Sequence, residues 1–331
     1  MFRSACAMIL GLVIGSTGLC AQPYNMTIAG FSPGGLVSAL GVGMDSALAT
    51  AYPGSAVTYQ TSSGGLANAM LVSQGKVPLG LISDHEVPIA WFGRPPFKTE
   101  IRNLRLLFRP IVGESRFLLS HVVVTKAWAL ENGVKRFADL RNKPVRIAIN
   151  RPGNIDGDVS LAMLKEIGVT PSSVTKSGGQ VVRAASSEMK SLMLDRRIDL
   201  FILGISYNHP NITEIASGID IIMLPVAEDV AKAVSEEWNT AKCMIEKREY
   251  KFLEADTYNP CIGIGVYASD TMSEDLAYLF TKAMFSNIEK IRASHRALAD
   301  VVNPNTMALP GLIPFHPGAE RYLREAGILK K

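Results

Sequence analysis

Short apolar runs alternate with helical repeats along most of the chain, and polar turns join them. After the first apolar run comes a glycine-rich turn, and then Leu36, Leu40, Met44 and Leu48 recur every four residues. That spacing places the four side chains on one face of a helix. Strands that alternate with helices are typical of α/β domains with mainly parallel sheets.

The same periodicities assign the rest of the chain. Strands are predicted at residues 26–29, 56–60, 79–83, 104–108, 117–124, 145–150, 200–203, 219–224 and 262–268. Helices are predicted at residues 36–50, 65–73, 137–140, 159–167, 187–196, 228–238, 274–286 and 319–326. The joint at residues 145–158 repeats the strand, turn and helix order of the first joint. A chain of 331 residues favours two domains, so two α/β lobes with a ligand cleft between them are expected.

The N-terminus has the pattern of an export signal. Arg3 is followed by an uncharged and mostly apolar run over residues 5–19, and residues 19–21 resemble a cleavage site that ends at Ala21. A membrane anchor is one alternative, although the run is shorter than the roughly 20 residues that a span needs. Lipidation of Cys20 is the other, although residues 17–19 form a poor lipobox.

The charge, the cysteines and the histidines of the chain indicate which partners, covalent links and metal sites to expect. The formal net charge is only +4, without a charge run, so nothing argues for a nucleic-acid partner. Outside the signal only Cys243 and Cys261 remain. In an oxidising compartment they are expected to pair, which stabilises the fold by about 3 kcal/mol in the chain-entropy model; two free buried thiols are the alternative. The five histidines lack metal-ligand spacing, so no metal site is expected, although residues far apart in the sequence could still converge in space. No cofactor is expected either.

Two glycine-bearing turns precede helices at equivalent places in the first part of the chain. The first turn contains Ser32, Gly34 and Gly35, and the second contains Ser62 and Ser63. Helix N-termini present unpaired N–H groups and the positive end of a dipole, and glycine lets a ligand approach the backbone. The turns therefore predict a cradle for a small anion, with simple chain reversal as the alternative.

Side chains near the ends of the predicted strands are the other candidate ligand contacts. They are Asn68, Asp84, Arg151, Asn154, Tyr207 and His209. Arg151 is suited to a bidentate pair with a ligand carboxylate, and Asp84 to a hydrogen bond from a ligand amine. Each also has a structural alternative: a helix surface for Asn68, a cap for Asp84 and a surface position for Arg151.

Catalytic and nucleotide-binding motifs do not fit these turns. Residues 61–65 lack the glycine two positions before the serine that a hydrolase elbow has, and residues 30–35 lack the Gly-Lys-Ser/Thr end of a Walker loop. An enzyme is therefore not expected. An exported enzyme and a soluble sensory co-receptor, which presents a bound solute to a signalling partner, stay open as alternatives.

Six elements in order resemble the TAXI-type solute receptors of TRAP transporters, over nearly the whole mature chain. Residues 27–30 with Pro33-Gly34-Gly35 resemble the family's Thr-Gly-Gly-Pro-Gly-Gly start. Residues 60–68 and 71–75 resemble its Gly-Gly-Ser-x-x-Asn and Leu-x-x-Gly elements. Residues 137–145 follow, and the most specific run, His-Pro-Gly-Ala-Glu-Arg-Tyr-Leu-Arg-Glu-Ala-Gly, lies at residues 316–327.

The resemblance implies a type II periplasmic-binding-protein fold, in which two α/β lobes joined by a hinge close around a small solute. Residues 22–115 and 226–331 would form the first lobe, and residues 116–225 the second. The protein would be a periplasmic receptor that binds a glutamate-like amino acid, a keto acid or a dicarboxylate and delivers it to a TRAP-type membrane permease. The family's ligand contacts map to Ser32, Gly34, Gly35, Ser62, Ser63, Asn68, Arg151, Asn154 and Tyr207.

Three departures from the family pattern bear on the ligand. Leu36 and Leu66 follow the glycines where the family has hydroxyl residues, and residues 154–156 replace a Ser-Gly-Thr run. The chain thus lacks donors that suit a carboxylate, while Asp156 adds a charge that repels one unless it caps the helix. A ligand that is more apolar than glutamate, or that carries an amine, is expected.

Overall fold

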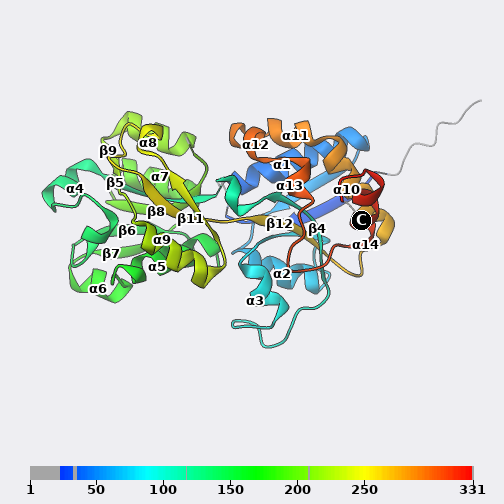
Figure 1. Cartoon of the computed structure of the whole chain (residues 1–331), viewed down its shortest axis with the longest axis horizontal. Coiled ribbons are helices and arrows are strands. Elements are labelled where there is room, and N and C mark those ends of the chain that lie inside the picture. Colours follow the sequence, from blue (N-terminus) through cyan, green and yellow to red (C-terminus); the bar gives the residue numbers. More distant parts are fainter. Residues whose placement is uncertain (1–22, 33–35, 117, 208, 330–331) are drawn as a thin grey trace, which may run out of the picture.

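The computed structural model describes residues 23–32, 36–116, 118–207 and 209–329, and within them the chain forms two α/β lobes side by side. Figure 1 shows the two ends of the chain, in blue to cyan and orange to red, in one lobe. The middle of the chain, in green and yellow, forms the other lobe. Each lobe contains one β-sheet with helices packed against it, so the duplicated pattern of the sequence corresponds to two folded units.

The first lobe is built on a five-stranded sheet in the order β2-β1-β3-β12-β4. Its strands are β1 (Asn25–Ala29), β2 (Ala56–Gln60), β3 (Leu79–Ser83), β4 (Leu104–Ile111) and β12 (Ile264–Ser269). Its helices are α1 (Leu36–Ala51), α2 (Gly65–Ser73), α3 (Glu86–Trp91), α10 (Glu274–Ser286), α11 (Ile288–Ala293), α12 (Arg296–Val301), α13 (Pro304–Met307) and α14 (Pro317–Glu325). β1 lies parallel to β2 and β3, whereas β12 is antiparallel to β3 and β4.

The second lobe is built on a sheet in the order β10-β11-β5-β8-β6-β7, with β9 also paired to β5. Its strands are β5 (Leu119–Thr125), β6 (Arg146–Ile149), β7 (Gln180–Arg183), β8 (Leu200–Ile205), β9 (Ile221–Met223), β10 (Ala241–Ile245) and β11 (Thr257–Cys261). Its α-helices are α4 (Lys126–Glu131), α5 (Ile155–Glu166), α6 (Pro171–Lys176), α7 (Ser186–Leu194), α8 (Pro210–Gly218) and α9 (Glu228–Trp238), with 3₁₀ turns η2 (Phe137–Leu140) and η3 (Lys247–Glu249).

Helix α1 illustrates how the sequence pattern produces a core. Leu40, Met44 and Leu48 from its apolar face are at most 1% exposed and belong to one cluster with Ile28 of β1 and Phe280 of α10. Full burial of such a side chain stabilises the fold by about 1.5–3 kcal/mol. The helix is therefore fixed against the sheet of the first lobe.

The chain crosses between the lobes twice. The first crossing leaves β4 and passes through the 3₁₀ turn η1 (Gly113–Ser115) to β5, and the second passes from β11 to β12 through Ile262 and Gly263. The expected division assigned residues 226–331 to the first lobe, whereas β10 and β11 pair within the second sheet. Sheet membership depends on long-range pairing, which the local hydrophobic pattern does not encode.

Element positions agree better with the sequence pattern than strand directions do. The predicted strands at 56–60 and 79–83 and the predicted helices at 65–73, 228–238 and 274–286 have the observed ends. The expectation of mainly parallel sheets is wrong, because antiparallel pairs outnumber parallel pairs among the described strands. The pattern also misses β7, β10 and β11; β11 contains Asn259 and Pro260, residues that are depleted in strands. In the described residues no helix is long and apolar enough to cross a bilayer.

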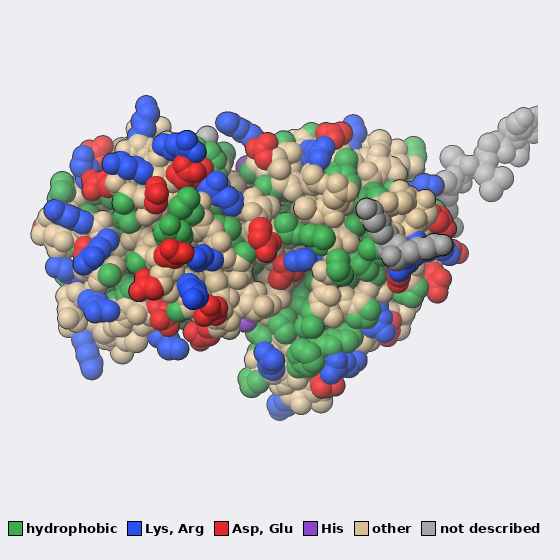
Figure 2. Space-filling model, viewed as in Figure 1, with side chains coloured by type: hydrophobic (Ala, Val, Ile, Leu, Met, Phe, Trp, Pro, Cys, Tyr) green, Lys and Arg blue, Asp and Glu red, His purple; other side chains and the backbone are tan. Residues whose placement is uncertain are grey.

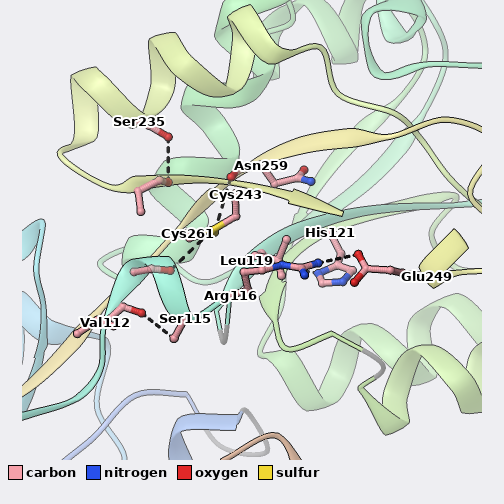
Figure 3. The surroundings of a disulfide bond; sticks show 12 residues. Val112, Ser115, Arg116, Leu119, His121, Ser235, Cys243, Glu249, Asn259 and Cys261 are labelled. Atoms are coloured by element: carbon pink, nitrogen blue, oxygen red, sulfur yellow. Dashed lines mark hydrogen bonds and ion pairs between the residues drawn. A yellow bond between two sulfur atoms is a disulfide. The ribbon is translucent and has the colours of Figure 1, made fainter. Parts of the chain in front are cut away.

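A disulfide ties β10 to β11. Cys243 and Cys261 are bonded, with their Cα atoms 6.0 Å apart, at diagonal positions of an antiparallel pair in which Cys243 faces Asn259. Figure 3 shows the bond beside the turn that carries Val112 and Ser115, where the chain first crosses between the lobes. The covalent link therefore lies next to both crossings.

Replacing both cysteines with alanine is expected to lower the free energy of unfolding by about 3 kcal/mol, because the unfolded chain is then no longer closed into a loop. Urea unfolding followed by far-UV circular dichroism measures the change. Dithiothreitol should lower the stability of the wild type by a similar amount and leave the double variant unaffected. Equal stability of the reduced and oxidised wild type would contradict the prediction.

Candidate functional site

A pocket lies where the two lobes meet, at the narrow waist of the molecule in Figure 2. Apolar side chains from both sides of the waist form part of its wall: Phe31, Val37, Leu118, Ile155, Ile262 and Ile264. The rest of the wall is Ser32 from the first lobe with Asn150, Asn154, Asp156, Ser186 and Gly204 from the second. Apolar walls with a few convergent polar groups are typical of small-molecule sites.

Ser32 connects the two lobes through hydrogen bonds inside this pocket. Its Oγ donates to Oδ1 of Asn150 at 3.1 Å, and Nδ2 of Asn154 donates to Ser32 Oγ at 3.4 Å. All three side chains are buried, with at most 6% exposed. Ser32 follows β1, and Asn150 directly follows β6. Asn154 caps α5 by accepting a hydrogen bond from the backbone N–H of Asp156 at 3.0 Å. The polar ends of strands from both sheets therefore converge on one point.

Asn150 is the centre of the polar part of the pocket. Its Oδ1 also accepts from the backbone N–H of Arg151 at 2.9 Å, and its Nδ2 lies 3.3 Å from Ser186 Oγ and 3.4 Å from Asp156 Oδ2. Sequence reasoning missed Asn150 and Ser186 as site residues. The signal for Asn150 was present, since it is the polar residue that directly follows a buried strand.

The backbones of the two lobes come very close beside this network. Gly64 precedes helix α2 with φ +150°, and a Cβ atom there would lie 1.9 Å from the carbonyl oxygen of Gly153 in the second lobe. Gly153 in turn faces Ser63. The second glycine turn of the sequence therefore serves as a contact between the lobes.

The N-terminus of α2 is occupied by a carboxylate of the protein itself. Glu86 Oε1 accepts from the backbone N–H of Leu66 at 3.2 Å, and Oε2 accepts from the backbone N–H and the hydroxyl of Ser83 at 3.0 and 2.6 Å. Burial raises the pKa of Glu86 to about 7, although these hydrogen bonds oppose the rise. The expected anion cradle at this turn is therefore already filled by a side chain.

Ser62 and Asn68, two further predicted contacts, bond to the first lobe itself. Ser62 Oγ lies 2.7 Å from the carbonyl oxygen of Gly30 and 2.6 Å from Oδ1 of Asn68. Asn68 Nδ2 donates to the carbonyl oxygens of Gly30 and Leu81 at 3.0 and 2.7 Å, and the residue is fully buried. Together they connect the end of β1 to the middle of β3.

The remaining predicted residues are dispersed around the molecule. Asp84 forms an ion pair with Arg109 at 2.5 Å, in a polar recess beside Gly263, and burial raises its pKa. Arg151 forms an ion pair with Glu188 at 2.9 Å, and both side chains are half exposed. The hydroxyl of Tyr207 donates to the carbonyl oxygen of Glu249 at 3.0 Å. His209 caps α8 and its ring stacks on that of His295 in the first lobe. Gly34 and Gly35 lie outside the described residues.

Asp156 gives the pocket its charge. It is the only charged side chain among the described lining residues, and neither Lys nor Arg is among them. Burial raises its pKa to about 6, while hydrogen bonds from the Gly204 N–H and from Asn150 lower it. Across the described chain no group of three or more His, Cys, Asp or Glu side chains is placed to hold a metal ion.

Comparisons with known proteins agree with this architecture. The sequence profile of the NMT1-like family matches residues 28–327. PhnD1 from Prochlorococcus marinus (MIT 9301), in complex with methylphosphonate, superposes with a TM-score of 0.54 at 12% identity, covering 93% of this chain and 100% of that one. A protein from Bordetella bronchiseptica RB50 superposes with a TM-score of 0.50 at 14% identity, covering 92% and 89%. The alkanesulfonate-binding protein SsuA from Xanthomonas axonopodis pv. citri, bound to MOPS, gives 0.44 at 12% identity, covering 85% of each chain.

These matches bear on the fold and the family. The superposition on PhnD1 and the two observed sheets confirm the expected type II periplasmic-binding-protein fold of two lobes with a cleft between them. The narrower resemblance to TAXI-type receptors stays a prediction.

The buried Glu86 is expected to make stability depend on pH. Its pKa is about 7 when folded against 4.5 as the ordinary value, so between these values the folded state holds a proton that the unfolded state has lost. The free energy of unfolding should therefore fall by about 3 kcal/mol as pH rises from 4.5 to 7. Urea unfolding at pH 5 and pH 7.5 measures this slope.

Glu86→Gln should reduce that slope, because the variant has no proton to release. Glu236→Gln is the matched control, since Glu236 on α9 has a side chain 69% exposed and its removal should leave the slope unchanged. An undiminished slope in Glu86→Gln would show that other groups cause it.

Proposed function

This chain belongs to the NMT1-like family, and we propose that it is a non-enzymatic receptor that encloses a small organic solute between its two lobes. The observation that carries the proposal is the pocket at the waist, where Ser32 of one lobe bonds to Asn150 and Asn154 of the other. Polar groups that pair with each other across a cleft are available to a ligand once the lobes separate.

Binding would proceed by rotation of the lobes about the two crossings. Two short connections between otherwise separate sheets are a typical hinge for closure around a ligand. In the open form Ser32, Asn150 and Asn154 would exchange their mutual hydrogen bonds for water, and a solute would then replace that water. The apolar walls would contribute by excluding solvent from the bound solute.

We further propose export to the periplasm and delivery of the solute to a TRAP-type permease. Support comes from the leader pattern over residues 1–21 and from the six sequence elements that resemble TAXI-type receptors. The solute would be an amino acid, a keto acid or a dicarboxylate. Uptake into proteoliposomes that contain a candidate permease should require the receptor and an ion gradient, and uptake without the receptor would refute this assignment.

A thermal-shift panel tests the receptor function. The panel contains amino acids, keto acids, dicarboxylates and methylphosphonate, each titrated against the purified mature chain. A true ligand should raise the melting temperature in a saturable way, because binding to the folded state alone stabilises it by mass action. If no solute shifts the melting temperature, or if a solute is recovered chemically altered, the proposal fails.

Two neighbouring residues provide a matched pair of variants. Asn150→Ala removes the centre of the pocket network and should weaken solute binding at least tenfold, since hydrogen bonds contribute about 1 kcal/mol each and 1.4 kcal/mol is a factor of ten. Arg151→Ala removes a half-exposed side chain that pairs with Glu188 and should change affinity less than twofold.

Isothermal titration calorimetry on folded variants, checked by circular dichroism, gives both affinities. The opposite ranking, with Arg151→Ala weak and Asn150→Ala normal, would move the ligand out of the pocket and towards the arginine.

A further inference from the structure

The carboxylate of Asp156 lies in the wall of the pocket with acceptor capacity to spare. Only 7% of the residue is exposed. One oxygen accepts from the backbone N–H of Gly204 at 2.6 Å, and the other lies 3.4 Å from Asn150 Nδ2. An ionised carboxylate accepts about four hydrogen bonds, so these two contacts leave part of its capacity for another donor.

The charge of Asp156 is also uncompensated. Within the described residues no Lys or Arg forms an ion pair with it. Asp158, two residues further along α5, adds repulsion. Arg183 acts on Asp158 and donates to the carbonyl oxygen of Asn150 at 3.0 Å. A buried charge without a partner is costly, and a cation placed beside it recovers that cost.

Glu86 shows what a purely structural buried carboxylate looks like in this protein. Both of its oxygens are occupied, by the N–H of Leu66 and by the N–H and hydroxyl of Ser83, and it lines none of the described pockets. Asp156 accepts fewer hydrogen bonds, one of them long at 3.4 Å, and it lines a pocket. The Asp156 carboxylate also needs a glycine at position 204, because a Cβ atom there would lie 2.7 Å from its Oδ1.

On the premise of the receptor function proposed above, we propose that the pocket selects a solute with a protonated nitrogen, and that Asp156 is its counter-ion. The nitrogen would donate to the oxygen that now lies near Asn150. The walls formed by Phe31, Ile155 and Ile264 would receive an apolar part of the same solute. A solute whose polar end is an anion alone would meet a carboxylate of like charge, with no lysine or arginine among the described lining residues to offset it.

An amino acid and the matching keto acid differ only at the α-carbon, which carries an ammonium group in the first and a keto oxygen in the second. Such pairs of solutes test this specificity on the wild type. We choose L-valine against 3-methyl-2-oxobutanoate and L-glutamate against 2-oxoglutarate, measured by isothermal titration calorimetry at pH 7.5. In at least one pair the amine should bind ten times more tightly than the keto acid or better.

Variants then assign the preference to a residue. Asp156→Asn keeps the size of the side chain and an oxygen for the Gly204 N–H, and it should weaken the amine at least tenfold while leaving the keto acid unchanged or tighter. Asp158→Asn, on the same helix but not among the described lining residues, removes a charge without changing the pocket and should keep the wild-type preference. Circular dichroism confirms that each variant is folded.

The outcomes separate this inference from the receptor function. If the keto acids bind as tightly as the amines or more tightly, the receptor function holds and the role of Asp156 is refuted. The role is also refuted if folded Asp156→Asn keeps the preference. If no member of either pair binds the wild type, this inference fails, and the wider panel decides whether the receptor function fails with it.

Discussion

The pocket exists because the two lobes can touch backbone to backbone at their seam. At Gly64 and Gly153 no side chain stands between the lobes, and any Cβ on Gly64 would overlap the facing carbonyl. That approach brings the strand ends of both sheets within reach of each other. Ser32 can then bond to Asn150 and Asn154, which lie more than a hundred residues away in the chain. The polar network and the apolar walls around it both depend on this close contact between the two lobes, which the two glycines permit.

The helix N-termini near the seam illustrate a second constraint, which is that positive helix ends do not stay unsatisfied. At α2 the buried carboxylate of Glu86 meets the free N–H groups. At α5 the Asn154 side chain caps the first turn, and Asp156 lies in that turn. A glycine turn before a helix thus indicates where backbone donors are exposed, but it does not say whether a solute or the protein's own acid will use them.

The sequence predicted the positions of many strands and helices well, because strand and helix periodicities are local properties. It also placed Ser32 and Asn154 in the cleft wall, since both follow predicted buried strands at the loop edge. It could not predict that the Glu86 carboxylate contacts the N-terminus of α2, because this contact joins residues that lie twenty positions apart and depends on side-chain geometry. Arg151 looked like a carboxylate clamp, yet Glu188 from α7 lies within bonding distance of it. The sequence pattern also did not predict that β10 and β11 belong to the second lobe, since strand pairing depends on contacts between distant segments.

The two crossings between the lobes differ in length. The first contains the 3₁₀ turn η1 between β4 and β5, whereas only Ile262 and Gly263 separate β11 from β12. The short crossing is held on one side by a covalently linked hairpin and on the other by the ion pair of Asp84 and Arg109, since a Cβ on Gly263 would lie 2.0 Å from an Asp84 oxygen. In the lobe rotation proposed above, the short crossing would be the pivot and the longer crossing the more flexible connection. The angle through which the lobes open would then be set by this short crossing, and it would be the same for every solute of the proposed receptor.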